Sequence, residues 1–338
     1  MRLYHLSHID LDGFSAQLLS TYFFEKYHFY NSNYGEEILI RVDSIFKDIK
    51  EHDDEEILVL ITDVNLTIEQ CGYIENKLYD TNNVKLQLLD HHITGSESAK
   101  AYDWYHLDDT KSATKITYEY LLKHFTPHSD ISALDKFVQG VNAADIWLEG
   151  DELFEFGKVC MQMISKTYEV PRDMFGVYDT SYKHAILKKA MEFLPSNDYI
   201  GLDEQVYFLK KEYLNIRNVK DTFENIASEY ILSLIKENED KFRLEVGGKK
   251  AIVSFKLSHI SILANHYLKA NEHIDFFINV SAKGHVSLRS NNKADVSKIS
   301  QKCFDGGGHK NASGGTIKGF KNSFHYSDIK KQVATILA

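Results

Sequence analysis

The chain has 338 residues, 43% hydrophobic and 26% charged, which are ordinary values for a folded globular protein and argue against a disordered or fibrous one. No apolar run is long enough to cross a bilayer, and the N-terminus shows no signal-peptide pattern, so we expect a cytoplasmic protein. Three widely spaced cysteines, Cys71, Cys160 and Cys303, argue against a disulfide framework or a zinc ribbon.

The net charge of -10 is unevenly distributed along the chain. Residues 243–338 carry 15 Lys and Arg against 6 Asp and Glu, whereas residues 1–242 carry 24 against 43. A basic C-terminal region facing an acidic, metal-charged N-terminal region would suit a short phosphorylated ligand, whereas a long duplex would need a broader basic surface. Two solvated surfaces of different charge are the simpler interpretation, and both stay open.

The first predicted strand, Leu3–Leu6, is followed by a helical pattern that begins at Phe14. Between them lies His8-Ile9-Asp10-Leu11-Asp12-Gly13. In an extended segment, residues two apart point the same way, so one imidazole and two carboxylates could face a common point. Gly13 would let the turn close tightly. Alone, this pattern is weak, because strands often end in polar residues.

Strands and helices then alternate. The expected elements are an apolar segment at Ile38–Ile40, a helix near Asp43–His52, a buried strand at Ile57–Ile61, a helix at Ile68–Leu78 and a strand at Val84–Leu89. This order predicts a doubly wound α/β domain with a mainly parallel sheet. Ligands of such sheets bind at the carboxyl ends of the strands, where Asp63 and Asp90-His91-His92 follow the later strands.

The remainder of the chain reads first as helices and then as a second domain. We expect helices at Thr110–Leu122, with Ser112 a plausible N-cap, and at Leu134–Val141, which leads into Asp145. From Arg243 onward, a hairpin, two helices and two further strands predict a smaller mixed α/β domain. The expected ranges are 1–190 for the first domain, 191–242 for a helical linker region and 243–338 for the second domain.

The ordered motifs together resemble the DHH/DHHA1 phosphoesterase family. They are His8-x-Asp10-x-Asp12-Gly13, Asp63 after a buried strand, Asp90-His91-His92, Ser112-Ala113-Thr114 at a helix start, Asp145 after two alanines, and Gly306-Gly307-Gly308-His309. They extend over nearly the whole chain and are far more specific together than singly. The two-domain length is most similar to the oligoribonuclease branch known as nano-RNases.

The resemblance implies a centre with two divalent cations. His8, Asp10 and Asp63 would hold one ion, and Asp12, Asp63, His91 and Asp145 the other, with Asp63 bridging. Ligands of this type, without thiolate, suit Mn²⁺, with Mg²⁺ or Co²⁺ as alternatives, and zinc is not excluded. Two such ions can activate a water and clamp the phosphoryl oxygens. The expected catalytic residues are His92, beside the scissile phosphate, with Asp63 and Asp90.

The second domain is expected to bind the substrate. The resemblance assigns this role to Arg289 and Ser290, and the glycines would let backbone N–H groups approach an anion closely. The full expected set is Arg289, Ser290, Gly306, Gly307, Gly308, His309 and Asn311, with Lys310 as a possible addition. Taken singly, each of these features has a simpler explanation, since a glycine run is usually a turn and a lone Asp is usually a helix cap or solvated.

These expectations define a hydrolase that degrades short RNA oligonucleotides to 5'-mononucleotides. The alternatives are a 3'-phosphoadenosine 5'-phosphate phosphatase, a phosphodiesterase for linear dinucleotides such as pApA, and a catalytically silent nucleotide-binding protein. The expected partners are short RNA or nucleotide phosphates, with no membrane and no long duplex nucleic acid. A monomer and a homodimer both stay open.

Overall fold

The computed structural model describes residues 1–51, 55–79, 81 and 83–338. These residues form two compact units, which we describe separately. Unit 1 comprises residues 1–167 and 180–209, and unit 2 comprises residues 168–179 and 210–338. The domain ranges expected from the sequence, 1–190, 191–242 and 243–338, differ from these units and remain a proposal.

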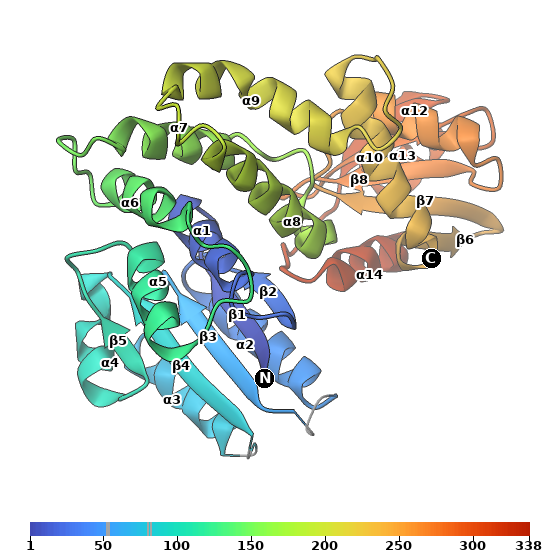
Figure 1. The fold of residues 1–338 in the computed structure, drawn as a ribbon. Coiled ribbons are helices and arrows are strands. Elements are labelled where there is room, and N and C mark those ends of the chain that lie inside the picture. The colour runs from blue at the N-terminus through green and yellow to red at the C-terminus, as the bar shows by residue number, and fades with distance from the viewer. Residues whose placement is uncertain (52–54, 80, 82) are drawn as a thin grey trace. The chain divides into compact units, whose positions relative to one another are not determined.

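Within its described residues, unit 1 is built on a five-stranded sheet in the order β2-β1-β3-β4-β5, with every neighbouring pair parallel (Figure 1). The strands are β1 (Arg2–Ser7), β2 (Tyr27–Asn31), β3 (Ile57–Thr62), β4 (Val84–Asp90) and β5 (Tyr105–Leu107). Every residue of β3 is buried, which confirms the prediction of a central strand covered on both faces. The predicted α/β class is confirmed.

Helices cover both faces of this sheet (Figure 1). The helical elements that belong wholly to unit 1 are α1 (Leu11–Ser20), α2 (Glu36–Ile49), α3 (Ile68–Leu78), the 3-10 turn η1 (Ile93–Gly95), α4 (Ser96–Ala101), α5 (Ala113–His124), α6 (Leu134–Asp145) and α7 (Phe154–Ser165). Side chains of α2 and α3 pack on the face that presents Ile57, Val59 and Ile61, whereas α1 and α5 contact the opposite face.

Two early expectations differ from this architecture. The apolar segment Ile38–Ile40 lies inside α2, which begins at Glu36, seven residues before the expected start. The expected end of that helix at His52 lies outside the described residues. Strand β2 is not predicted from the sequence, because Tyr27–Asn31 is short, mixes aromatic with polar side chains and lacks an alternating apolar pattern.

Unit 2 contains, in the part of the chain described, a six-stranded sheet in the order β10-β11-β9-β8-β7-β6. Its strands are β6 (Arg243–Val246), β7 (Lys249–Phe255), β8 (Phe276–Val280), β9 (His285–Ser290), β10 (Gly307–His309) and β11 (Ala312–Thr316). Among these pairs β7–β8 is parallel and the rest are antiparallel, which confirms the expected mixed α/β class.

The helices of unit 2 pack around this sheet and each other. They are α10 (Phe223–Glu237), α11 (Glu239–Phe242), α12 (Ile260–Ala270), α13 (Val296–Cys303) and α14 (Tyr326–Leu337). Two longer helices, α8 (Arg172–Met191) and α9 (Tyr199–Leu214), contribute residues to both units. None of the helices in the described residues has the length and apolarity that crossing a bilayer requires.

Candidate metal centre

The turn that joins β1 to α1 carries the first two candidate ligands, His8 and Asp10. Asp10 is the N-cap of α1, and its Oδ1 accepts a hydrogen bond from the Gly13 amide at 3.1 Å. Nδ1 of His8 lies 2.8 Å from Oδ2 of Asp10. A Cβ at position 13 would lie 2.4 Å from the His8 carbonyl oxygen, so this close turn requires glycine.

Asp12 lies in the first turn of α1 rather than in an extended segment, so the expected strand-like alternation through Asp12 is wrong. Its buried carboxylate accepts hydrogen bonds from two amides at the start of α5, with Oδ2 at 2.7 Å from the Ala113 nitrogen and Oδ1 at 2.8 Å from the Thr114 nitrogen. Thr114 Oγ1 also donates to the Asp12 carbonyl at 2.8 Å. The N-terminus of α5 therefore fixes the position of Asp12.

Asp63 follows β3 directly and is buried. Its φ of 57° is in the left-handed region, which most residues avoid but Asp and Asn tolerate. No described residue forms a hydrogen bond with its Oδ2 atom. A strained, buried carboxylate with an open oxygen is a feature that clusters at functional sites.

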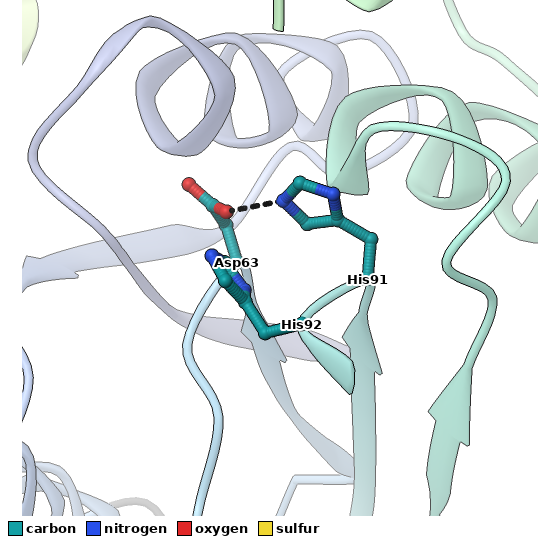
Figure 2. A group of neighbouring side chains, drawn as sticks. All are labelled: Asp63, His91 and His92. Carbon is teal, nitrogen blue, oxygen red and sulfur yellow. Dashed lines mark ion pairs between the residues drawn. The ribbon is translucent and has the colours of Figure 1, made fainter. Parts of the chain in front are cut away.

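The side chains converge at the carboxyl edge of the sheet, in the described part of unit 1, as three groups whose ligand atoms lie within 4.8 Å of one another. The groups are His8, Asp10 and Asp63; Asp12, His91 and Asp145; and Asp63, His91 and His92. Figure 2 shows the third group, with the His91 imidazole directed at Asp63, whose Oδ1 lies 3.3 Å from His91 Nε2. The first group contains the residues of one predicted ligand set, and the second contains three of the four residues of the other. The fourth residue, Asp63, lies 3.3 Å from His91 and 3.7 Å from His8.

The carboxylates at this edge disfavour one another's charged forms. Burial, with the charges of Asp10 and Asp12 added, raises the pKa of Asp63 well above its ordinary value. Burial, followed by the charges of Asp12 and Asp10, raises the pKa of Asp145 to about 9. Like Asp63, Asp145 has an Oδ2 atom without a hydrogen-bond partner among the described residues. Clustered carboxyl oxygens and imidazoles are a donor set that fits divalent cations, whose charge would favour the ionised carboxylates.

The carboxylate of Asp90 is hydrogen-bonded to the His92 imidazole. The imidazole Nδ1 lies 2.7 Å from Oδ1 of Asp90, and Tyr105 donates from its hydroxyl to Oδ2 of Asp90 at 2.8 Å. The hydrogen bond to Asp90 raises the pKa of His92 despite an opposing effect of burial. Asp90 therefore orients His92, and Nε2 of that imidazole points away from the buried carboxylate.

Two residues of the centre, Asp145 and Tyr34, could not be placed from the predicted strands. Asp145 is the last residue of α6 and follows no strand, so its placement depended on the family resemblance. Tyr34, which the sequence analysis did not name, follows β2, and its hydroxyl lies 2.9 Å from Nε2 of His92. Recognising β2 would have identified Tyr34, because the carboxyl end of β2 is at the same edge of the parallel sheet.

In unit 2, three residues occupy one row across neighbouring strands. Arg289 of β9 is opposite Ala312 of β11, and Ala312 is opposite His309 of β10. Cross-strand partners share a face of the sheet, so the guanidinium and the imidazole flank a small alanine. Arg289 donates from Nη2 to Ser261 Oγ at 3.0 Å, and His309 is exposed. Binding of an anion by this row stays a prediction.

The other expected substrate-binding residues have roles inside unit 2. The Ser290 hydroxyl donates to the Asp275 carbonyl at 2.9 Å and accepts from the Ala294 amide at 3.0 Å. The Asn311 amide group forms two hydrogen bonds with Asn292. Substrate contacts by these two side chains stay a prediction that this geometry does not favour.

The glycine run is part of the sheet rather than a loop. Gly307–His309 forms strand β10, and the Gly306 amide donates to the Ser300 carbonyl at 3.2 Å. At Gly308, whose φ is 144°, a Cβ would lie 2.7 Å from the Ala312 carbonyl oxygen, so the strand pairing itself requires this glycine. A Cβ at Gly307 would meet nothing within 4 Å. Anion binding along this strand stays a prediction.

Comparison with known proteins supports the assignment of both units. Residues 248–337 match the DHHA1 domain model. A 3',5'-cyclic-nucleotide phosphodiesterase of Helicobacter pylori is 40% identical over 343 residues, covering 99% of each chain. The crystal structure of an uncharacterized protein from Helicobacter pylori G27 is 40% identical with a TM-score of 0.94, covering 100% of this chain and 99% of the other.

A pGpG-specific phosphodiesterase from Vibrio cholerae overlaps far less well, with 10% identity and a TM-score of 0.29 over 100% of this chain and 99% of the other. The full-length relationship at 40% identity, together with the converging His and Asp groups, leaves no support for a catalytically silent protein. The chain belongs to the DHH/DHHA1 phosphoesterase family and is a metal-dependent phosphodiesterase.

Proposed function

We propose that this enzyme hydrolyses small nucleotide phosphodiesters with the help of two divalent cations, of which Mn²⁺ suits the ligands best. The observation that carries the proposal is the convergence of two separate His and Asp groups, linked through Asp63, at one edge of the sheet. Cations held there would stabilise the negative charge on the phosphoryl oxygens and activate a water for attack.

The chain's own residues have distinct tasks in this proposal. His8, Asp10 and Asp63 hold one ion, and Asp12, Asp63, His91 and Asp145 hold the other. The hydrogen bonds from α5 to Asp12 keep that carboxylate in place before any ion arrives. Such preorganisation reduces the rearrangement that metal and substrate binding would otherwise require.

His92 would contact the scissile phosphate. Because Nδ1 is hydrogen-bonded to Asp90, a substrate oxygen would approach Nε2, which is hydrogen-bonded to the Tyr34 hydroxyl at 2.9 Å. An imidazole in this position stabilises the charge that develops on the phosphoryl group. Asp90 would act on the reaction through the orientation of His92.

A 3',5'-cyclic nucleotide is our first candidate substrate, because the relative with 40% identity over the full length carries that activity in its name. A linear dinucleotide is the second candidate. It carries a further phosphate, and the row of Arg289 and His309 in unit 2 offers two cationic or donating groups for one. Short RNA oligonucleotides, the first expectation from sequence, become the third candidate.

The test is a ranking of kcat/KM for the Mn²⁺-loaded enzyme. The panel contains 3',5'-cyclic AMP and GMP, pApA, pGpG, RNA of two to about ten nucleotides, and 3'-phosphoadenosine 5'-phosphate. We expect a cyclic nucleotide or a dinucleotide to rank above every longer RNA by at least about tenfold, and the His91→Ala variant to be inactive throughout. Highest activity on the longer RNAs would overturn the substrate assignment, and no hydrolysis of any nucleotide would overturn the proposal itself.

A further inference from the structure

Tyr34 lies in the short connection between β2 and α2, and several hydrogen bonds fix this connection in place. The Asn33 amide donates to Oε2 of Glu37 at 2.9 Å, and the Gln70 side chain donates to the Gly35 carbonyl at 3.2 Å. Gly35 has a φ of 86°, which lets the chain reverse direction immediately after Tyr34. The side chain is therefore presented from an anchored turn.

Two of the proposed centre's imidazoles contact this tyrosine. The Tyr34 ring centroid lies 4.6 Å from that of His8 and 5.5 Å from that of His92, with an edge-on arrangement toward His92. The hydroxyl lies 2.9 Å from His92 Nε2. The residue is nevertheless 43% exposed, so part of its ring faces solvent at the centre.

The contact to His92 extends a chain of hydrogen bonds from the protein interior. Tyr105 donates to Asp90, Asp90 is bonded to Nδ1 of His92, and Nε2 of His92 is bonded to the Tyr34 hydroxyl. A phenol has one proton, so the Tyr34 hydroxyl can donate to a phosphate oxygen when it accepts its hydrogen bond from Nε2–H of His92. The hydroxyl and Nε2 of His92 lie 2.9 Å apart, so a phosphate group placed beside Nε2 is also beside Tyr34.

We propose that Tyr34 is a substrate-contacting residue of this enzyme, whose hydroxyl bonds a phosphate oxygen beside His92 and whose exposed ring packs against the nucleoside. The inference rests on the proposed function, since it takes the substrate to be a nucleotide diester. Packing alone explains the geometry less well. A ring that served only to cover His8 would not need a hydroxyl directed at Nε2 of a second imidazole.

The hydroxyl and the ring can be tested separately. Tyr34→Phe removes the hydroxyl and keeps the ring, whereas Tyr34→Leu removes both. Tyr27 provides matched controls, Tyr27→Phe and Tyr27→Leu, because it is 42% exposed, stacks on Phe29 and lies at the opposite end of β2. Each variant is assayed on the best nucleotide diester and on methyl p-nitrophenyl phosphate, a diester with no ribose or base.

We expect Tyr34→Phe to lower kcat by about tenfold on both substrates with little change in KM, as for the loss of one hydrogen bond that forms in the transition state. Tyr34→Leu should in addition raise KM by about tenfold for the nucleotide and leave KM for methyl p-nitrophenyl phosphate unchanged. Bound Mn²⁺ and the melting temperature should match those of the wild type and of both Tyr27 variants.

Unchanged kcat in Tyr34→Phe on both diesters would overturn the inference, as would a Tyr34→Leu variant whose defect is explained by lost Mn²⁺ or a lowered melting temperature. The failure of the proposed function has a different signature. It would appear as a wild-type enzyme that hydrolyses methyl p-nitrophenyl phosphate and no nucleotide, and a lowered kcat of Tyr34→Phe on that simple diester would then still support the contact made by the hydroxyl.

Discussion

Oδ1 of Asp63 lies 3.3 Å from Nε2 of His91, and this contact links the two groups of side chains at the carboxyl edge of the sheet. On its other side, Oδ2 of Asp63 lies 3.7 Å from Nδ1 of His8. One buried carboxylate thus lies beside a histidine of each group. Its removal should affect both proposed ions at once.

We expect Asp63→Asn to reduce hydrolysis by at least about a thousandfold and to lower the number of bound Mn²⁺ ions from two. Asn tolerates the left-handed φ of 57° and carries no charge, so the metal-free variant should melt at or above the wild-type temperature. Steady-state rates, metal content and thermal melts in EDTA check these points. Asp109→Asn, an exposed carboxylate of unit 1, is the control, and wild-type activity in Asp63→Asn would contradict the bridging role.

Asp12 should behave differently, because its carboxylate accepts hydrogen bonds from two amides of α5. Asn can accept only one of them and would direct an N–H group at the other. We expect Asp12→Asn to lower the free energy of unfolding by roughly 1–3 kcal/mol in urea titrations of the metal-free protein. A metal-free Asp12→Asn protein as stable as Asp63→Asn would show that the α5 contacts contribute little.

Asp145 should make both the stability of the metal-free protein and its affinity for Mn²⁺ depend on pH. Its folded pKa of about 9 exceeds the unfolded value near 3.8, so the folded state binds more protons between these values and the contribution of Asp145 to stability falls as the pH rises from about 4 to about 9. Asp145→Asn should flatten this fall in metal-free protein. Metal binding must displace the proton, so the affinity for Mn²⁺ should rise over the same range. Calorimetric titration at pH 6, 7 and 8 measures it, and an affinity that falls with pH would contradict the assignment.

Asp90 should act through His92. Asp90→Asn keeps the shape of the side chain but removes its negative charge and weakens its hydrogen bond with Nδ1 of His92. We therefore expect kcat to fall by about a hundredfold with little change in KM. Tyr105→Phe removes the hydrogen bond to Oδ2 of Asp90 and should give a smaller loss of the same kind. A large increase in KM with normal kcat in either variant would argue against this indirect role.

Arg289 tests the part assigned to unit 2. Arg289→Ala should raise KM for a linear dinucleotide by about tenfold or more while leaving bound Mn²⁺ unchanged, because it removes the guanidinium beside His309 in the row of the sheet. Lys283→Ala removes an exposed positive charge from the turn before β9 and is the control. Equal KM values for Arg289→Ala and wild type would remove this row from the proposed substrate site.

Much of unit 1 could be predicted because its signals are local. The apolar run Ile57–Ile61 predicted β3, and the residues after β3 and β4 could be placed together by the geometry of parallel sheets. Asp145 could not be placed this way, because it ends a helix and its position depends on how α6 packs. The positions of long-range partners in a fold are not encoded in strand or helix periodicity.

The conformations around Asp12 and the glycine run show a second limit. Asp10 caps α1 and so starts the helix at Leu11, which turns Asp12 toward α5 instead of continuing a strand. The glycines at 306–308 suggested a loop from composition, but pairing with Ala312–Thr316 makes a strand of Gly307–His309. The cap at Asp10 and the pairing of β10 with β11 are both local, but neither apolar periodicity nor glycine content indicates them.

The central claim is that cations bound by these His and Asp side chains are required for hydrolysis, and a metal titration tests it most directly. Protein stripped with EDTA is titrated with Mn²⁺ while metal content and the hydrolysis of 3',5'-cyclic AMP, pGpG and methyl p-nitrophenyl phosphate are followed in parallel. We predict that stripping abolishes activity and that it returns as the content approaches two ions per chain. Full activity in protein shown to contain no metal would contradict the account.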